Sequence, residues 1–444
     1  MAFDRRETAI LLIGDFLILA ASLWVALLLR NLAIPTWGYF EANLIPFVPM
    51  FLISLVVFYI SGLYEKQTKP IRRKMGVRIL GAQGATTAIA AILFFVLPLS
   101  IAPKIILLLY LLVSIIAESI WRFARMKKEI KDSDRTPALL IGTGSAQQEL
   151  FDEVNGNPRY LIRFVDRIDT ALLPAGGVYT AIENSKAGEK VVVIDSTDAA
   201  VIREMPVLYG FLAGAVTLTD FSTLYEEIFD RVPLDHVDSV QLMQSLPKSH
   251  EFYDLAKRLF DIVLAIFLSV IAIPFITIAV ALLLPQGGQP FIFNERIGKG
   301  GRTFRIIKLR SMLFNDQGQP ELQQKNRVTG VGKVLRKTRI DELPQLWNVF
   351  VGDLSFIGPR PELPKIAETY EREIPQYRLR HVVSPGLSGW AQIHDTDAPK
   401  GPADVKRTRR KVSFDLYYLK NRSFGLDLAI ALKTLRTLLS LSGV

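Results

Sequence analysis

Long apolar runs, separated by short polar segments, dominate the first third of the chain. They cover residues 9–29, 44–63, 77–97 and 105–121. Each run is close to the roughly 20 residues that a helix needs to cross a bilayer. The pattern therefore predicts a bundle of four transmembrane helices over residues 1–131.

The polar segments between these runs differ in charge. Residues 65–78 and 122–131 are rich in Lys and Arg, whereas residues 31–43 and 98–104 hold one Lys between them. Basic loops remain on the cytoplasmic side of a membrane. We therefore expect both ends of the bundle to face the cytoplasm.

Two carboxylates, Asp15 and Glu118, lie inside these apolar runs. Acidic residues within a membrane can mark a transport pathway. Both residues are near the ends of their runs, within reach of the headgroups and of nearby arginines. We expect them to have structural partners instead.

A pattern of shorter apolar runs begins at Pro137. Residues 138–154 indicate a strand, a glycine turn and a helix, and the segments YLIRFVDR, KVVVIDS and GAVTLTD indicate further buried strands. Strands that alternate with helices are typical of a parallel sheet. We therefore predict a cytoplasmic, Rossmann-like α/β module over residues 136–245.

The glycine turn of this module partly matches a dinucleotide-binding fingerprint. Gly142 and Gly144 occupy the first two glycine positions, but Gln147 occupies the third. Asp166 follows about 20 residues later, where a ribose-binding acid is expected. Two interpretations stay open: a nucleotide site, or a degenerate module that serves regulation or homodimer contacts.

A fifth apolar run, residues 257–284, is long enough to span a bilayer but differs from the others. Pro274 lies near its middle, where proline removes a backbone hydrogen bond and favours a kink or break. Both flanks are basic, and a simple span would carry the following domain and its positive charge to the outer face. We predict a re-entrant helix that breaks at Pro274 and returns to the cytoplasmic side.

The composition of the chain limits which partners and which kinds of active site are possible. A chain of 444 residues predicts two to four domains, and its net charge of +10 indicates an acidic partner. The membrane segments favour anionic lipid or a phosphorylated substrate over nucleic acid. The absence of cysteine excludes disulfides and thiol nucleophiles, and only four histidines argue against a His-rich metal centre.

Two adjacent carboxylates, Asp341 and Glu342, stand among cations ahead of a short amphipathic helix predicted over residues 343–350. The neighbouring cations are Arg336, Lys337, Arg339 and Arg360. We expect the two acids to cap this helix, whose dipole and surrounding cations would keep both ionised. An ionised carboxylate can coordinate Mg²⁺ or attack phosphorus.

The turn Gly358-Pro359-Arg360-Pro361 is rigid and fixes one guanidinium, which suits bidentate phosphate recognition. Acids, a metal and arginines suffice for phosphoryl transfer, which depends mostly on positioning and charge neutralisation. Each motif alone also has a structural interpretation, since acidic pairs often begin helices and Pro-Arg-Pro occurs in ordinary loops.

The ordered motifs KLRSM, DELPQLWNVFVGDLSFIGPRPE, PGLSGWAQ and DLYYLKN resemble the bacterial sugar transferases, the monotopic polyprenol-phosphate phosphoglycosyl transferases. The full layout resembles their large subfamily, which includes undecaprenyl-phosphate galactose and glucose phosphotransferases. The resemblance implies an α+β catalytic domain over residues 252–444, with a re-entrant helix and interfacial amphipathic helices. It also implies a location at the bacterial inner membrane, with this domain on the cytoplasmic face.

The resemblance also implies a reaction. A hexose 1-phosphate passes from a UDP-sugar to undecaprenyl phosphate through a covalent aspartyl phosphosugar, with Mg²⁺, and UMP is released. This step initiates exopolysaccharide, capsule or O-antigen synthesis. Carried onto this chain, Asp341 is the nucleophile and Glu342, with Asp341, the Mg²⁺ ligand.

Further residues match family motifs. Arg360 is expected to bind phosphate, and Lys308, Arg310, Arg380 and Gln392 are expected to contact phosphate or nucleotide.

One departure from the family concerns the helix break. The family often has Ser-Pro there, whereas this chain has Ile273-Pro274. The missing hydroxyl would have to be replaced by Ser269 or Thr277.

The end of the chain has two further membrane-related patterns. Residues 406–411 form a basic run, read either as a solvated loop or as a contact for anionic lipid or phosphate. Residues 424–441 are apolar with spaced cations, which predicts an interfacial helix.

Two other functions remain as alternatives. An NAD-dependent nucleotide-sugar dehydratase would need a Tyr-x-x-x-Lys pair, and Tyr253 and Lys257 have that spacing. A transporter or a scaffold for polysaccharide assembly is the non-enzymatic alternative. No motif indicates which sugar is transferred.

Overall fold

The computed structural model describes most of the chain: residues 5–64, 79–87, 89, 104–125, 135–158, 160–174, 176–184, 191–210, 217–237, 239–246, 251–314, 326–394 and 404–439. Of the predicted third apolar run, residues 77–97, only 79–87 and 89 are among these. The basic segment 65–78 lies outside them.

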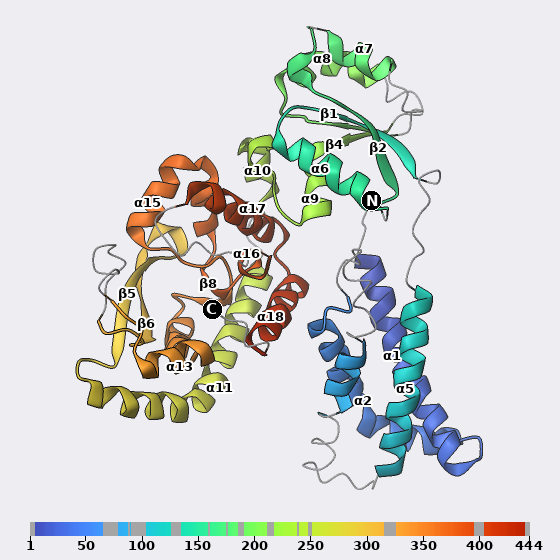
Figure 1. The fold of residues 1–444 in the computed structure, drawn as a ribbon, viewed down its shortest axis with the longest axis vertical. Helices are drawn as coiled ribbons and strands as arrows, with labels where there is room; N and C mark the ends of the chain where they lie inside the picture. The colour runs from blue at the N-terminus through green and yellow to red at the C-terminus, as the bar shows by residue number, and fades with distance from the viewer. Residues whose placement is uncertain are drawn as a thin grey trace. The chain divides into compact units, whose positions relative to one another are not determined.

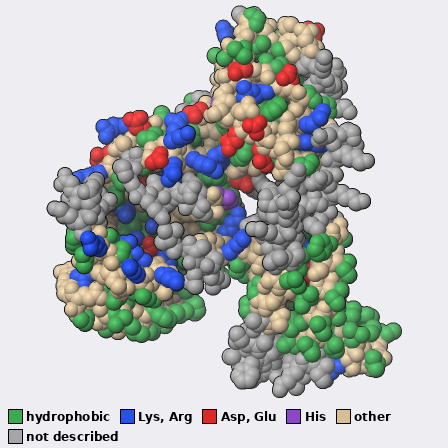
Figure 2. Space-filling view, viewed as in Figure 1, with side chains coloured by type: hydrophobic (Ala, Val, Ile, Leu, Met, Phe, Trp, Pro, Cys, Tyr) green, Lys and Arg blue, Asp and Glu red, His purple; other side chains and the backbone are tan. Residues whose placement is uncertain are grey.

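In the described part of the first third there are three long apolar helices: α1 (Arg5–Asn31), α2 (Trp37–Ile60) and α5 (Lys104–Arg125). Together with Glu251–Gln286, they give four helices in the described residues that are long and apolar enough to cross a membrane. Phe47 and Phe51 of α2 pack against Tyr110 of α5. Figure 2 shows hydrophobic side chains over the outer surface of these helices, as expected for contact with lipid.

A buried polar cluster joins these helices at one end. Asp15 of α1 forms an ion pair with Arg122 of α5 and accepts hydrogen bonds from Tyr64 and from Trp121 Nε1. Arg122 also donates to the carbonyl of Leu63, just beyond α2. The start of α1 and the ends of α2 and α5 therefore lie together, which agrees with the predicted topology. Asp15 has the structural partners that we expect for it, whereas both carboxylate oxygens of Glu118 are buried without a hydrogen-bond partner among the described residues.

The middle of the chain forms a four-stranded sheet in the order β2-β1-β3-β4. The strands are β1 (Thr136–Ile141), β2 (Ile162–Ile168), β3 (Val191–Ile194) and β4 (Thr217–Asp220), and β1 pairs with β2 in parallel. The accompanying helices are α6 (Ser145–Gly156), η2 (Thr170–Leu172), α7 (Gly177–Glu183), α8 (Ala199–Leu208) and α9 (Phe221–Phe229). The predicted α/β arrangement is confirmed.

The glycine turn after β1 has the backbone expected of the fingerprint. Gly142 and Gly144 have φ angles of 150° and 117°, which glycine adopts without strain. The third position differs, because Gln147 is fully buried inside the module. Asp166 is exposed on β2, where it accepts a hydrogen bond from the amide of Arg167. Nucleotide binding here stays a prediction.

The last half of the chain combines short strands with many helices (Figure 1). The antiparallel pair is β5 (Phe291–Ile297) and β6 (Thr303–Leu309), and the parallel pair is β7 (Ser355–Ile357) and β8 (Gly386–Ser388). The helices are η4 (Leu234–His236), α10 (Ser239–Ser245), α11 (Glu251–Leu283), η5 (Leu284–Gln286), η6 (Lys299–Gly301), α13 (Gly330–Thr338), η7 (Ile340–Glu342), α14 (Gln345–Val351), α15 (Pro364–Glu373), η8 (Pro375–Val382), α16 (Trp390–His394), α17 (Val405–Asn421) and α18 (Phe424–Leu439).

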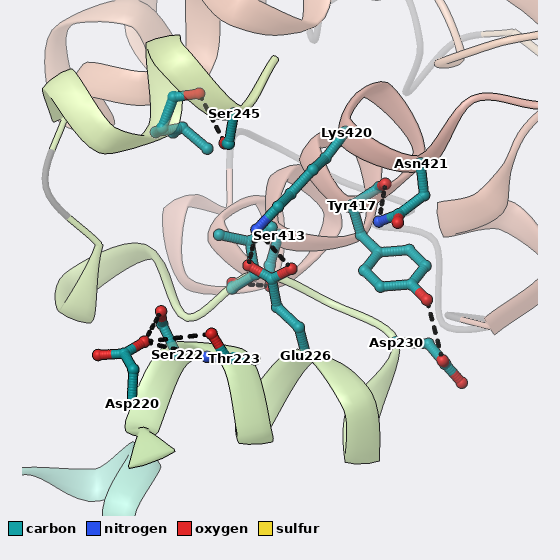
Figure 3. A network of polar contacts seen from close by, with 12 residues as sticks. Asp220, Ser222, Thr223, Glu226, Asp230, Ser245, Ser413, Tyr417, Lys420 and Asn421 are labelled. Atoms are coloured by element: carbon teal, nitrogen blue, oxygen red, sulfur yellow. Dashed lines mark hydrogen bonds and ion pairs between the residues drawn. The ribbon is translucent and has the colours of Figure 1, made fainter. Parts of the chain in front are cut away.

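Helix α17 lies in the main core of this region. Val412 and Tyr418 are buried there beside Tyr377, and Val232 and Leu234, which follow α9, belong to the same core. Polar contacts continue the packing: Figure 3 shows Lys420 of α17 reaching Glu226 of α9, at 2.9 Å.

Helix α11 presents a narrow buried face. Ala265, Ala272 and Ala279 recur every seven residues and are buried, whereas most of the larger apolar side chains of this helix are exposed. The helix continues through Pro274, and Figure 1 shows it bent into two limbs. The hydroxyl of Thr277 donates to the carbonyl of Ile273 at 2.9 Å. The predicted bend is present, but the helix does not break at Pro274. The Thr277 hydroxyl bonds to Ile273 and not to the carbonyl of Val270, which is the acceptor that loses its helical donor at Pro274. Re-entrant placement stays a prediction.

Candidate active site

The backbone around the acidic pair is a sequence of tight turns. Helix α13 ends at Thr338, Arg339 adopts a left-handed conformation (φ 59°, ψ 15°), and Asp341 and Glu342 lie in the one-turn helix η7. The expectation that the acids cap the next helix is wrong. The N-cap of α14 is Pro344, without a side-chain cap bond, because the acids already belong to the preceding turn.

Three cationic side chains lie close to the carboxylate of Glu342. Lys308 Nζ from β6 donates to its Oε1 at 2.9 Å, Arg360 Nη2 lies 3.6 Å from the same oxygen, and Arg339 Nη1 lies 3.5 Å from Oε2. Burial alone would raise the pKa of Glu342, but Lys308, Arg360 and Arg339 outweigh it and lower this pKa to about 2. Glu342 is therefore a carboxylate at any physiological pH.

Asp341 has a different environment. The residue is 8% exposed, and its Oδ1 is buried without a hydrogen-bond partner among the described residues. Burial, followed by the charge of Glu342, raises the pKa of Asp341 to about 6 against the effect of Lys308 and nearby arginines. The prediction that both acids are ionised holds near neutral pH, but Asp341 is much the more basic of the two.

Arg360 projects from a turn that is held by its backbone. The amide of Gly358 donates to the carbonyl of Ser388 at 2.8 Å, and the amide of Gly386 donates to the carbonyl of Pro359 at 2.9 Å. A Cβ at Gly386 would lie 2.1 Å from the nitrogen of Gly358, so only glycine allows this approach. The side chain of Arg360 stays 41% exposed and faces Glu342.

Two of the residues predicted to contact phosphate or nucleotide have contacts elsewhere. Arg310 is 8% exposed and donates to the carbonyl of Leu283, at the end of α11, at 3.3 Å. Gln392 lies on α16, and its amide donates to the carbonyl of Leu387 at 3.4 Å. Of the residues predicted to bind phosphate, the structure brings Lys308 and Arg360 to the acidic pair.

Arg380 is buried behind the Arg360 turn and contacts its main chain. Its guanidinium donates to the carbonyl of Arg360 and to the hydroxyl of Tyr377, both at 2.9 Å, and lies 2.7 Å from a carboxylate oxygen of Asp415. These contacts favour a positioning role over direct contact with phosphate.

Sequence reasoning gave no role to Glu362, which follows the Arg360 turn. Burial opposes its ionisation, but Lys411, Arg380 and Arg296 outweigh burial and lower its pKa. Lys411 forms an ion pair with Glu362. Lys411 ends the basic run at residues 406–411, which begins α17 and is therefore not a loop.

The donors at the acidic pair are compatible with Mg²⁺. The described residues contain no group of three or more acidic or histidine side chains that could together hold a metal ion. Mg²⁺ in phosphoryl-transfer sites is usually held by one or two carboxylates together with substrate phosphates. The adjacent carboxylates of Asp341 and Glu342 fit that requirement.

The Tyr253 and Lys257 pair has a structural explanation. The hydroxyl of Tyr253 and Nζ of Lys257 both donate to Oδ2 of Asp427 on α18, each at 2.7 Å. Tyr418 donates to the other oxygen of this carboxylate at 2.9 Å. The pair therefore fixes α11 to α18, and this argues against a dehydratase.

A buried Asp341 beside a partly exposed Glu342, with cations around Glu342 and a rigid arginine turn nearby, is compatible with a transferase site close to a long apolar helix. A sequence model described as bacterial sugar transferase matches residues 252–441. The chain is 36% identical over 215 residues to the UDP-glucose:undecaprenyl-phosphate glucose-1-phosphate transferase of Caulobacter vibrioides, covering 47% of this chain and 80% of that protein. The chain belongs to the bacterial sugar transferase family.

Other relatives have different sugars in their names. The UDP-N-acetylgalactosamine-undecaprenyl-phosphate N-acetylgalactosaminephosphotransferase of Aeromonas hydrophila is 45% identical over 223 residues, which are 48% of this chain and 50% of that protein. The UDP-galactose-lipid carrier transferase of Erwinia amylovora is 34% identical over 205 residues, which are 42% of this chain and 41% of that protein. The matched region thus spans half or less of these two curated relatives.

Proposed function

We propose that this protein transfers a sugar 1-phosphate from a UDP-sugar to undecaprenyl phosphate and releases UMP. The relatives' names describe UDP-sugars and undecaprenyl phosphate. The observation that carries the proposal is the buried, unpartnered Oδ1 of Asp341 beside a carboxylate that holds Lys308, Arg339 and Arg360.

The first step is attack by Asp341 Oδ1 on the phosphorus that bears the sugar. A bond forms between this oxygen and phosphorus, and the bond from phosphorus to the bridging oxygen of the diphosphate breaks. UMP leaves with that electron pair. A carboxylate with a pKa near 6 is more basic than an ordinary aspartate, and it is still mostly ionised at neutral pH.

The second step regenerates the enzyme. A phosphate oxygen of undecaprenyl phosphate attacks the phosphorus of the aspartyl phosphosugar, and the bond from phosphorus to Asp341 breaks. The products are undecaprenyl diphosphate sugar and the free carboxylate. Since both steps pass through a crowded phosphate anion, nearby positive charge accelerates both.

The cations of the site meet that need. Arg360 is half-exposed on its rigid turn, so its guanidinium can contact an incoming phosphate while it stays close to Glu342. Lys308 and Arg339 place two further charges at the same carboxylate. Glu342 and Asp341 would hold Mg²⁺, which would supply charge neutralisation at the diphosphate.

The acceptor is a lipid, and the surface near the site is apolar. Trp347 on α14, five residues after Glu342, is 57% exposed, and Phe350 and Val351 are exposed beside it. Figure 2 shows hydrophobic side chains over α11. We infer that α11 is re-entrant, that α18 lies in the interface, and that the catalytic domain is at the cytoplasmic face of the inner membrane. There the reaction would initiate exopolysaccharide, capsule or O-antigen synthesis.

The test is UMP release by the full-length protein with undecaprenyl phosphate and, in turn, UDP-N-acetylgalactosamine, UDP-glucose and UDP-galactose. We expect one or more of these donors to give UMP, and Asp341→Asn to abolish both turnover and a covalent adduct formed with the donor alone. Full activity of Asp341→Asn would exclude it as the nucleophile. If the wild type released no UMP from any donor, the scaffold alternative would gain support.

A further inference from the structure

We propose that Arg380 is a positioning residue, which fixes the main chain of Arg360 and so aims its guanidinium at the reacting phosphate. The inference rests on the proposed function, because Arg360 matters only if a phosphate binds there. It assigns Arg380 a place behind the site instead of in it.

The contacts of Arg380 support this role. The residue is 2% exposed, and its partners Tyr377 and Asp415 are 0% and 1% exposed. A buried charge destabilises a protein unless it is paired and hydrogen-bonded. Asp415 supplies the opposite charge, and the two terminal nitrogens donate to the hydroxyl of Tyr377 and to the carbonyl of Arg360, whereas Nε is buried without a hydrogen-bond partner among the described residues. The planar guanidinium fork is what allows one side chain to serve three partners.

The bond to Arg360 completes a set of restraints along the turn. Strand β8 holds Gly358 and Pro359 from one side, through Ser388 and Gly386. The amide of Ile297 holds the carbonyl of Glu362 at 3.0 Å on the other side. Arg380 holds the residue between them, at the carbonyl of the amino acid whose side chain reaches Glu342.

Helix α17 supplies the counter-charges for this arrangement. Asp415 pairs with Arg380, and Lys411, one turn earlier on the same helix, pairs with Glu362. The same helix carries Lys420, which pairs with Glu226 and does not contact the turn. Lys420 therefore offers a matched control: a charge of the same helix, also in an ion pair, but without a link to Arg360.

The test compares steady-state kinetics of the full-length protein with the UDP-sugars above. Arg380→Lys keeps the charge but cannot make all three contacts, and Tyr377→Phe removes one hydroxyl without loss of core volume. Since a hydrogen bond to a charged group contributes about a tenfold effect or more, we expect Arg380→Lys to raise the KM for the donor about tenfold. Tyr377→Phe should raise the KM by a smaller factor. Lys420→Gln should leave the KM unchanged, even if a smaller fraction of folded protein lowers the apparent kcat.

A double substitution separates positioning from general loss of structure. In an Arg360→Ala background the guanidinium is absent, so adding Arg380→Lys should not raise the KM further. The inference fails if Arg380→Lys lowers kcat but leaves the KM unchanged, or if the KM effects of the two substitutions multiply in the double variant. If the wild type releases no UMP from any donor, the proposed function itself fails and takes this inference with it.

Discussion

The charge on Asp341 lowers the stability of the folded chain, and the substitution Asp341→Asn removes that charge. Burial, followed by Glu342, raises its pKa from 3.8 to about 6. A tenfold change in proton affinity corresponds to about 1.4 kcal/mol, so the ionised carboxylate destabilises the folded state by about 3 kcal/mol above pH 6. We expect Asp341→Asn to be inactive and yet more stable than the wild type at neutral pH.

The pH dependence of this gain follows from the direction of the pKa change. The folded-state pKa lies above the unfolded value, so protonation of Asp341 stabilises the fold. That contribution is fully present below the unfolded pKa of 3.8 and is lost as the pH rises through about 6. The free energies of unfolding of wild type and variant should therefore agree near pH 3.8 and diverge as the pH rises to about 6.

Thermal unfolding of full-length protein in detergent, followed by tryptophan fluorescence, measures the effect. For a domain of 150 to 250 residues, about 3 kcal/mol corresponds to roughly 6–12 °C in Tm. Glu342→Gln is the control of opposite sign, because the lowered pKa of Glu342 means that its charge stabilises the fold at neutral pH. The reasoning would be refuted if Asp341→Asn and the wild type had equal Tm values at neutral pH. It would also be refuted if their Tm difference did not shrink in acid.

Three further predictions concern the same region. UMP release should fall as the pH drops through about 6, because Asp341 becomes protonated; a flat profile from pH 5 to 8 would contradict this. Gly386→Ala should destabilise the protein by about 1–3 kcal/mol and reduce activity, since its Cβ meets the Gly358 backbone. Gly425→Ala, which has open space, is the control in the same melting assay. Arg339→Gly should remove about 1 kcal/mol of left-handed backbone strain yet lower kcat/KM; unchanged kinetics would show that this cation is dispensable.

Features that depend on local sequence could be predicted. Each membrane helix satisfies its own backbone and is recognised from its apolar length alone. The alternation of strands and helices in the middle of the chain is equally local. The acidic pair and Arg360 were found because each stands inside a short, unusual motif.

Features that depend on distant partners could not be predicted. Arg310 and Arg380 look like phosphate ligands in sequence, since each is an arginine in a family motif. Their partners, the carbonyl of Leu283 and the carboxylate of Asp415, lie 27 and 35 positions away and are identified only by the fold. The expected helix cap failed for a smaller reason, because the left-handed Arg339 inserts a separate turn.

The two acids of the pair are adjacent in sequence but differ in proton affinity, and that difference is the basis of the proposed mechanism. Two like charges so close raise each other's pKa unless cations intervene. Lys308, Arg339 and Arg360 all lie at Glu342, so Glu342 stays ionised and its charge helps to raise the pKa of Asp341. The same arrangement leaves Oδ1 of Asp341 without a hydrogen-bond partner among the described residues. An oxygen that is basic, buried and unpartnered is the one expected to attack phosphorus, whereas a carboxylate already covered by three cations is suited to holding charge in place. The unequal division of cations therefore supports the two roles proposed for these acids with a physical argument that does not depend on the family's motif.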